Sequence, residues 1–225
     1  MSTGNDPTPT STSNKNQVVL RVLDVGCGSG DSLREELELR RKITSDTTQI
    51  EMVGVDIDEA ALEQGRAIYP QFLFVHAKGE HLPFADQSFD AITSRVALPY
   101  MNIPAALREM RRVLKPGGEL KIKLHPLTYT LQEIRAEMKS GPLWRKAQRF
   151  IYRGYVISNG LALHAAGINF PFPLSRRRCE SFQTKKGIQQ ALIAAGFSHV
   201  EIPIWKTATK WPHAGDCRAT ARRES

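Results

Sequence analysis

Residues 22–32 read VLDVGCGSGDS, and this stretch decides the fold. An apolar run, VLDV, is typical of a buried strand, and glycines follow it at alternate positions, Gly26, Gly28 and Gly30. Glycine has no Cβ, so the chain can turn sharply and its backbone can approach a ligand closely. A helical pattern begins near Ser32, and the free N–H groups at a helix start favour an electron-rich ligand. The stretch predicts a nucleotide-type pocket at the carboxyl end of the first strand of a doubly wound sheet.

Two carboxylates are expected beside this loop. Asp24 lies within the first apolar run, where an unpaired carboxylate would be costly, so it needs either backbone amides of the loop or a ligand amine as donor. A second apolar strand ends at Asp56, 26 positions after Gly30. In a doubly wound sheet its carboxylate would reach the loop and accept both hydroxyls of a ribose, with a helix-capping role as the alternative. Asp58 is predicted to cap the following helix.

The remaining pattern alternates strands and helices. Strands are predicted at 18–25, 51–58, 72–76, 89–94, 118–124, 199–205 and 217–223. Helices are predicted at 32–41, from 59, at 103–114 and after Thr184, with Leu33, Leu37, Leu39, Ile188, Leu192 and Ile193 facing inward. Pro203 favours an edge position for the strand that contains it, because proline cannot donate a ladder hydrogen bond.

Length and composition fit one globular domain at 18–225. The chain has 225 residues, 41% of them hydrophobic, and no run approaches the roughly 18 apolar residues of a membrane span. Residues 1–17 are rich in Ser, Thr, Pro and Asn and are predicted to be a disordered tail. The cysteines, Cys27, Cys179 and Cys217, show no metal-ligand or disulfide spacing. We therefore expect no bound metal and a cytoplasmic location.

Charge is divided unequally between the two halves of the chain. Residues 1–103 carry 9 Lys and Arg against 15 Asp and Glu, a net charge of −6, whereas residues 104–225 carry 22 against 8, a net charge of +14. A basic half is compatible with an anionic substrate, with RNA or with an acidic membrane surface. A well-solvated surface without a charged partner is the alternative.

Four segments, in this order, resemble class I S-adenosylmethionine-dependent methyltransferases: VLDVGCGSG, VGVDID, GEHLPFADQSFDAI and LREMRRVLKPGGELKI. The resemblance covers about 18–124 and points to the group of ubiquinone-biosynthesis and other small-molecule methyltransferases. It implies a Rossmann-like α/β fold, a doubly wound, seven-stranded, mostly parallel sheet whose seventh strand lies antiparallel beside the fifth. A nicotinamide or flavin enzyme is the rival for the loop, but its GxGxxG fingerprint requires glycine where this chain has Asp31.

The resemblance implies S-adenosylmethionine as cofactor and a set of contacts to it. The implied cofactor-binding residues are Asp24, Gly26, Cys27, Gly28, Gly30, Asp56, Ile57, Gly79, Glu80, Ser94 and Arg95. The loop would lie against the methionine and ribose portions, and Asp24 would receive the ammonium group. Asp56 would bind the ribose, and Ile57 would pack on the adenine face.

The other implied contacts lie after the third and fourth strands. Gly79 and Glu80 would contact adenine edges, and Ser94 and Arg95 would border the transferred methyl group, with an ordinary loop role as the alternative. The family often has aspartate at the position of Lys78, where it accepts from the adenine amino group, and lysine cannot accept. Either a backbone carbonyl replaces it or adenine is held less tightly. A cofactor-binding protein without catalysis is one interpretation of this departure.

Methyl transfer is an in-line displacement, and only a hydroxyl or protonated amine acceptor needs a base. His125, at the end of the fifth strand, is the predicted base. Tyr100 and His164 are weaker candidates, and a structural role is the alternative for each histidine.

An insertion at about 126–182, with helices at 130–139 and 143–155, is expected to form a helical lid over the substrate, as in the resembled family.

The predicted function is methyl transfer to a small-molecule acceptor, anionic or aromatic. The lid mixes aromatic and basic residues, including Arg176 to Arg178. Such a surface could also stack RNA bases beside phosphate-binding arginines. An RNA-directed methyltransferase that holds nucleic acid with its basic half is therefore the alternative. The sequence specifies neither the acceptor nor the oligomeric state.

Overall fold

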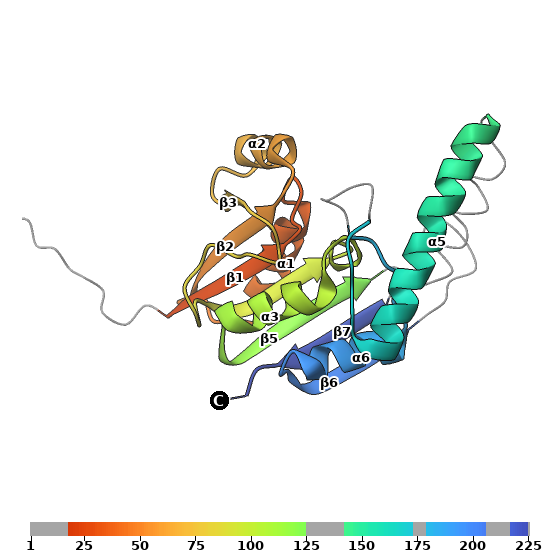
Figure 1. Ribbon diagram of the computed structural model, residues 1–225. Helices are drawn as coiled ribbons and strands as arrows, with labels where there is room; N and C mark the ends of the chain where they lie inside the picture. Colours follow the sequence, from red (N-terminus) through yellow and green to blue (C-terminus); the bar gives the residue numbers. More distant parts are fainter. Residues whose placement is uncertain (1–17, 125–141, 173–178, 206–216, 225) are drawn as a thin grey trace, which may run out of the picture.

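The computed structural model describes residues 18–124, 142–172, 179–205 and 217–224. A seven-stranded sheet organises it, in the order β3-β2-β1-β4-β5-β7-β6 (Figure 1). The strands are β1 (Val19–Val25), β2 (Gln49–Asp56), β3 (Leu73–His76), β4 (Phe89–Arg95), β5 (Leu114–Leu124), β6 (Ser198–Trp205) and β7 (Cys217–Arg222). β7 pairs antiparallel with β5 and β6, and the other pairs are parallel. This confirms the predicted doubly wound, mostly parallel sheet, with β6 at its edge as Pro203 indicated.

Helices cover both faces of the sheet. They are α1 (Asp31–Arg41), α2 (Glu59–Ile68), the 3-10 turn η1 (Leu98–Tyr100), α3 (Ile103–Val113), α5 (Leu143–Ala166) and α6 (Lys185–Ala194). Successive side chains of a strand point to opposite faces. Accordingly, Leu23 and Val25 of β1 join a core with α3 and α6, whereas Val22 joins a second core with α1 and α2. Each face therefore buries its own apolar layer.

The predicted helix caps are confirmed. Asp58 Oδ1 accepts a hydrogen bond from the Ala60 amide at 3.1 Å, at the start of α2. Thr184 Oγ1 accepts one from the Gly187 amide at 3.0 Å, at the start of α6. Each cap satisfies an amide that has no partner within its helix.

The helix α5 is longer than predicted. The sequence predicted a helix at 143–155, but the helix continues to Ala166, and Gly167 ends it with a φ of 67°. The helix continues through Gly160. A Cβ at this position would overlap the ring of Phe182. Glycine at this position lets the helix approach the segment that leads into α6, so tertiary contact outweighs its poor helix propensity.

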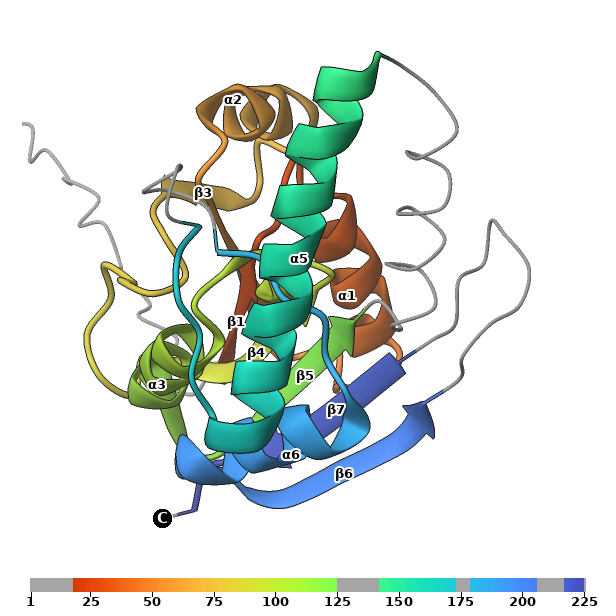
Figure 2. The same cartoon turned by 45° about the vertical axis from the view of Figure 1, so that its right-hand side comes forward.

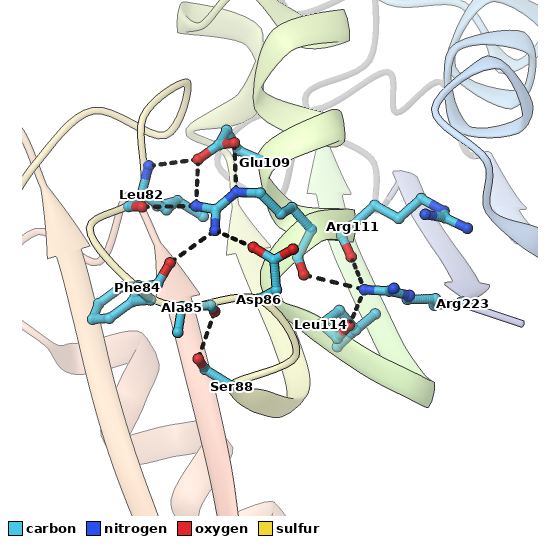
Figure 3. Close-up of polar contacts among 10 residues, drawn as sticks. Leu82, Phe84, Ala85, Asp86, Ser88, Glu109, Arg111, Leu114 and Arg223 are labelled. Atoms are coloured by element: carbon cyan, nitrogen blue, oxygen red, sulfur yellow. Dashed lines mark hydrogen bonds and ion pairs between the residues drawn. The ribbon is translucent and has the colours of Figure 1, made fainter. Parts of the chain in front are cut away.

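The loop between β3 and β4 is fastened to α3 by one guanidinium group. Arg112 donates to the carbonyl oxygens of Leu82 and Phe84, at 2.9 and 2.8 Å, and to Asp86 at 2.8 Å. Glu109, one turn earlier, holds the same guanidinium and also accepts from the Leu82 amide at 3.0 Å. Figure 3 shows how the loop and helix meet through these groups. The segment from Leu82 to Phe84 therefore packs this loop onto α3.

The helix α5 lies to one side of the sheet, and its C-terminal end contacts α6 (Figures 1 and 2). The predicted tail at 1–17, the predicted helix at 130–139 and Arg176 to Arg178 lie outside the described residues. In the parts of the chain that the structure describes, we find no helix with the length and apolarity needed to span a membrane.

Candidate functional site

A cavity of about 540 Å³ lies where the carboxyl ends of β1 and β2 meet the loops after β3 and β4. Pockets of about 300–1,000 Å³ typically hold small molecules and cofactors. Six of the predicted site residues line it: Gly26, Asp56, Ile57, Gly79, Glu80 and Tyr100. Six other predicted site residues lie in the described part of the chain but do not line the cavity: Asp24, Cys27, Gly28, Gly30, Ser94 and Arg95. The sheet topology thus brings together groups from four separate segments.

A side chain would have a different effect at each of the three loop glycines. A Cβ at Gly26, whose φ is 82°, would overlap the Cβ of Ala97, so this glycine lets the loop after β4 pack on the loop after β1. A Cβ at Gly30 would lie 2.7 Å from the ring of Phe74. At Gly28 a Cβ would meet nothing within 4 Å. Gly28 is therefore the position where the backbone faces open space that a ligand can enter.

Asp56 joins this open backbone to the cavity. Its Oδ2 accepts from the Gly28 amide at 2.8 Å, and its Oδ1 accepts from the Asp58 amide at 3.0 Å. Each carboxylate oxygen has two lone pairs, so acceptor capacity remains on both oxygens. The next residue, Ile57, lines the cavity with its side chain 61% exposed. An exposed aliphatic side chain beside a carboxylate suits a ligand with one apolar face and neighbouring hydroxyls.

Asp24 lies beneath the loop, fully buried, outside the described lining of the cavity. Ser32 Oγ and Thr93 Oγ1 donate to its carboxylate, the latter at 2.9 Å. Burial nevertheless raises the pKa of Asp24 to about 6, because the two hydroxyl donors only partly replace the lost hydration. Its donors in the described structure are therefore side chains of α1 and β4, and not the loop amides that the sequence left open.

Three further predicted residues have their side chains engaged with protein. Ser94 is fully buried, and its hydroxyl donates to the Val25 carbonyl at 2.9 Å. Arg95 pairs with Glu35 of α1 at 2.5 Å. The Cys27 side chain is buried in the core with α1 and α2, and burial raises the pKa of its thiol.

A chain of hydrogen bonds connects the cavity to α5. The carboxylate of Glu80 accepts from the Asn102 amide at 2.8 Å, and the Asn102 side chain donates to the Asn169 carbonyl at 3.2 Å. Asn169 Oδ1 accepts from the Ile103 amide at 3.1 Å, and its Nδ2 donates to Asn159 Oδ1 at 3.2 Å. Asn159 is fully buried in α5. The cavity wall and the insertion are therefore joined through buried amides.

Residues that the sequence did not indicate also form the wall: His81, Met101, Asn102, Pro171 and Cys179. Asn102 carries a signal, since Asn-Ile-Pro is a helix-start pattern directly after the β4 loop, and Asn102 caps α3. Pro171 and Cys179 carry none, because the insertion reaches the cavity only through tertiary packing. Burial raises the pKa of the Cys179 thiol, which keeps that side chain uncharged.

The loop after β4 begins with a strained residue. Val96 has a φ of 64°, which is rare for a β-branched side chain. Its amide donates to the Lys123 carbonyl at 2.8 Å, and the resulting turn places Ala97 against Gly26. Strained backbone of this kind is concentrated at functional sites. No residue pattern in the sequence indicates this strain.

The predicted catalytic residues differ in how they are placed. Tyr100 lines the cavity. His125 lies outside the described residues. The ring Nδ1 of His164 is 2.7 Å from Thr184 Oγ1, the cap of α6, and His164 is not among the described residues that line the cavity. Within the described residues, His, Cys, Asp and Glu side chains form no group of three that could hold a metal ion.

Comparison with known proteins finds a consistent family. The family described as "Methyltransferase domain" matches residues 22–118. A ubiquinone/menaquinone biosynthesis C-methyltransferase of Bartonella quintana is 42% identical over 107 residues, which is 44% of this chain and 38% of that protein. A malonyl-[acyl-carrier protein] O-methyltransferase of Erwinia pyrifoliae is 32% identical over 160 residues, 68% of this chain and 57% of that protein. The matches thus cover less than two thirds of these relatives' own lengths.

Solved structures share the fold. An S-adenosylmethionine-dependent methyltransferase from Mesorhizobium loti has a TM-score of 0.57 at 23% identity, with 92% of each chain covered. A methyltransferase from Haloferax volcanii, solved with the Trm112 methyltransferase activator, has a TM-score of 0.58 at 20% identity, with 93% of this chain and 84% of that chain covered. At these identities the likeness concerns the fold.

Proposed function

Because this chain belongs to the class I S-adenosylmethionine-dependent methyltransferases, we propose that it transfers the methyl group of S-adenosylmethionine to a small-molecule acceptor. The family implies the cofactor. The observation that carries the proposal is the wall of the cavity formed by Asp56 and Ile57 beside the open backbone at Gly28. This wall presents free acceptor capacity and an aliphatic surface, and the unobstructed backbone of Gly28 is joined to it through the hydrogen bond to Asp56.

The described residues fit the cofactor in three respects. Asp56 would accept the ribose hydroxyls, since its two amide donors leave lone pairs on both carboxylate oxygens. Ile57 would cover one face of the adenine. Glu80, a carboxylate in the lining, offers the acceptor that Lys78 cannot supply for an amino group. The departure at Lys78 is therefore compatible with adenine recognition.

S-adenosylmethionine, when bound, supplies a methyl group on a positively charged sulfur that a nucleophile can displace directly. The protein's task is then to align the reactants and to exclude water. Gly26, Ala97 and Met101 pack closely and form an apolar part of the wall. Tyr100 contributes a phenol to the same cavity and would orient an acceptor. If the acceptor needs a base, His125 remains our candidate.

Support for a small-molecule acceptor comes from the rest of the lining. Met101, Ala105, Pro171 and Cys179 form an uncharged side of the cavity, which suits an aromatic or aliphatic acceptor. Among the described lining residues, Lys78 is the only lysine or arginine. An RNA backbone would require several such cations at the site.

The test is transfer of a labelled methyl group from S-adenosylmethionine into fractionated cell extract, with small molecules, lipids and RNA offered separately. We expect saturable cofactor binding by calorimetry and label in the small-molecule or lipid fraction. Label in RNA alone would establish the RNA-directed alternative. Cofactor binding without transfer to any pool would indicate a binding protein without catalysis, and absence of cofactor binding would overturn the proposal.

A further inference from the structure

The helix α5 has two apolar sides, and the described protein covers one of them. Tyr155, Val156 and Leu163 are buried against the body. On the opposite side, exposed apolar side chains recur at helical spacing: Leu143, Trp144, Phe150, Ile151, Ile157 and Leu161. A surface helix ordinarily places charged or polar residues on the side away from its core. This exposed apolar stripe on α5 therefore needs a separate explanation.

The stripe is long and lies at the margin of the molecule. It runs from Leu143 to Leu161, about 27 Å at the rise of an α-helix. In Figure 1 the N-terminal half of α5 extends beyond the sheet, whereas its C-terminal half lies beside α6. Phe150, near the middle of the stripe, is 70% exposed. The first part of the stripe therefore belongs to the portion of α5 that extends beyond the sheet.

Charge identifies the kind of surface. The 24 residues of α5 include Arg145, Lys146, Arg149 and Arg153 but no Asp or Glu. Arg153 pairs with Glu180 at 3.4 Å, whereas Arg145 is exposed and lies over the ring of Trp144 at 5.1 Å. A cationic helix is attracted to an anionic surface and repels a second copy of itself. The positive charge of α5 therefore disfavours pairing with the same helix of another molecule.

The chemistry of the stripe separates lipid from nucleic acid. RNA bases stack on aromatic rings, and phosphates require hydrogen-bond donors. Leu143, Ile151, Ile157 and Leu161 are aliphatic and provide neither. Helices that lie in a membrane interface combine such aliphatic groups with tryptophan or phenylalanine on one face and with lysine and arginine on the other.

We propose that α5 docks on a membrane surface that contains anionic lipid, with the exposed apolar stripe inserted at the boundary between headgroups and acyl chains. The helix then lies in the plane of the membrane. Trp144 and Phe150 are at interfacial depth, and Arg145 reaches the lipid phosphates. The proposal concerns this surface alone and does not depend on methyl transfer.

Flotation of the full chain with lipid vesicles tests the proposal. The wild-type protein should float with vesicles of mixed phosphatidylcholine and phosphatidylglycerol, and about tenfold less with phosphatidylcholine alone, because the cations of α5 need anionic lipid. Phe150→Glu should lower binding to the mixed vesicles by about tenfold or more, because it would bury a charge among acyl chains. The tryptophan emission should shift to shorter wavelength on binding, and Trp144→Phe should remove that shift.

The matched control is Ile193→Glu, which places the same charge at a 57% exposed apolar residue of a different helix, α6. It should bind vesicles as the wild type does, and thermal unfolding should show both variants folded. Equal losses for the two variants, or unchanged binding of Phe150→Glu, would overturn the proposal. So would a wild-type dimer in sedimentation that Phe150→Glu dissociates, or RNA binding lost in that variant while vesicle binding is unaffected.

Discussion

At the scale of single residues, Asp24 shows how a carboxyl group is kept within an apolar strand. Ser32 and Thr93 each donate one hydroxyl hydrogen bond to it, and the side chain is otherwise enclosed by protein. Because burial outweighs these bonds, its pKa rises from 3.8 to about 6. The folded protein therefore holds a proton on Asp24 over a pH range in which the unfolded chain has released it.

This shift predicts that the free energy of unfolding falls as pH rises from about 4 to about 6, because Asp24 loses its proton in the folded state. The folded state binds more protons than the unfolded state across this window, so the stability that protonation contributes is present below it and lost above it. The loss from this group is on the order of 3 kcal/mol. Urea unfolding of the wild type and Asp24→Asn at several pH values measures it. Asp24→Asn should show a flatter profile in this window, and parallel profiles would contradict the assignment.

Asp56 and Asp58 form a natural pair for testing the cofactor site. Asp56→Ala should weaken S-adenosylmethionine binding by about 1.5–3 kcal/mol, roughly ten- to a hundredfold, since it removes a charged acceptor. Asp58→Ala removes the cap of α2 and should cost about 1 kcal/mol of stability while leaving affinity unchanged. Calorimetric titration and thermal unfolding of both variants separate the two roles. Equal affinity loss in both would remove Asp56 from direct binding.

The loop glycines predict opposite outcomes for the same substitution. Gly26→Ala should destabilise the fold by about 2 kcal/mol or more, because its Cβ would overlap Ala97 and its φ is positive. Gly28→Ala meets no neighbouring atom, so it should cost about 1–2 kcal/mol of strain and chiefly weaken cofactor binding. Denaturant unfolding and cofactor titration give both quantities. Retained affinity in folded Gly28→Ala would show that the ligand does not approach this backbone.

At the scale of elements, Arg112 holds the loop after β3 against α3. The carbonyls of Leu82 and Phe84 and the carboxylates of Asp86 and Glu109 all face its guanidinium (Figure 3). These bonds raise the pKa of Arg112, so it stays charged throughout the accessible pH range. Lys78, Gly79 and Glu80 of the cavity wall belong to the first part of the same loop. The contacts of Arg112 therefore support the adenine side of the proposed site.

Arg112→Met should lower the free energy of unfolding by about 2–3 kcal/mol, because two loop carbonyls and a partly buried carboxylate lose their donor. Arg108, exposed on the same helix, is the control, and Arg108→Met should change stability by less than about 0.5 kcal/mol. Urea unfolding of both variants measures the difference. Similar values for both would mean that water replaces the guanidinium without cost.

The sequence predicts elements well where a local cause determines them. Asp58 and Thr184 have side chains that cap helices, and Pro203 lacks an amide donor, so each marks its position without tertiary information. The inward orientation predicted for Leu39 and Ile193 is wrong, since both are exposed. Ile193 directly follows the buried Leu192 near the end of α6, where a modest rotation decides which apolar residue is covered. Leu39 is two positions after the buried Leu37, about 200° around the helix, so it lies on the opposite face of α1.

At the scale of the whole molecule, the cavity has two origins that differ in predictability. The wall from Gly26, Asp56 and Gly79 lies within the segments that resemble the family, because the ends of parallel strands must converge. The wall from Pro171 and Cys179 comes from the insertion and depends on side-chain contacts between distant segments. Neither the length of α5 nor the buried asparagine connections could be predicted from local pattern.

These asparagine connections predict that α5 and the cavity wall are mechanically linked. Asn159 donates to the Glu180 carbonyl at 2.9 Å and accepts from the Phe170 amide at 3.0 Å, as well as from Asn169. Asn159→Leu would leave these buried groups unpaired and should cost about 2–4 kcal/mol. The segments after α5 would loosen first, so their amides should exchange hydrogen faster than in the wild type. The amides of β1 should exchange as slowly as they do in the wild type.

The control for this variant is Ser158→Ala, next to Asn159 but exposed, whose hydroxyl donates only to the Tyr155 carbonyl in the same helix. It should change neither exchange nor stability by a measurable amount. Cofactor affinity of Asn159→Leu should fall severalfold, because Asn169 would no longer be fixed and the Asn102 and Glu80 side of the cavity would lose its support. Unchanged affinity with faster exchange at 168–171 would show that the cavity wall stands without the insertion. Uniformly faster exchange in β1 as well would mean that Asn159 stabilises the whole fold and not the link.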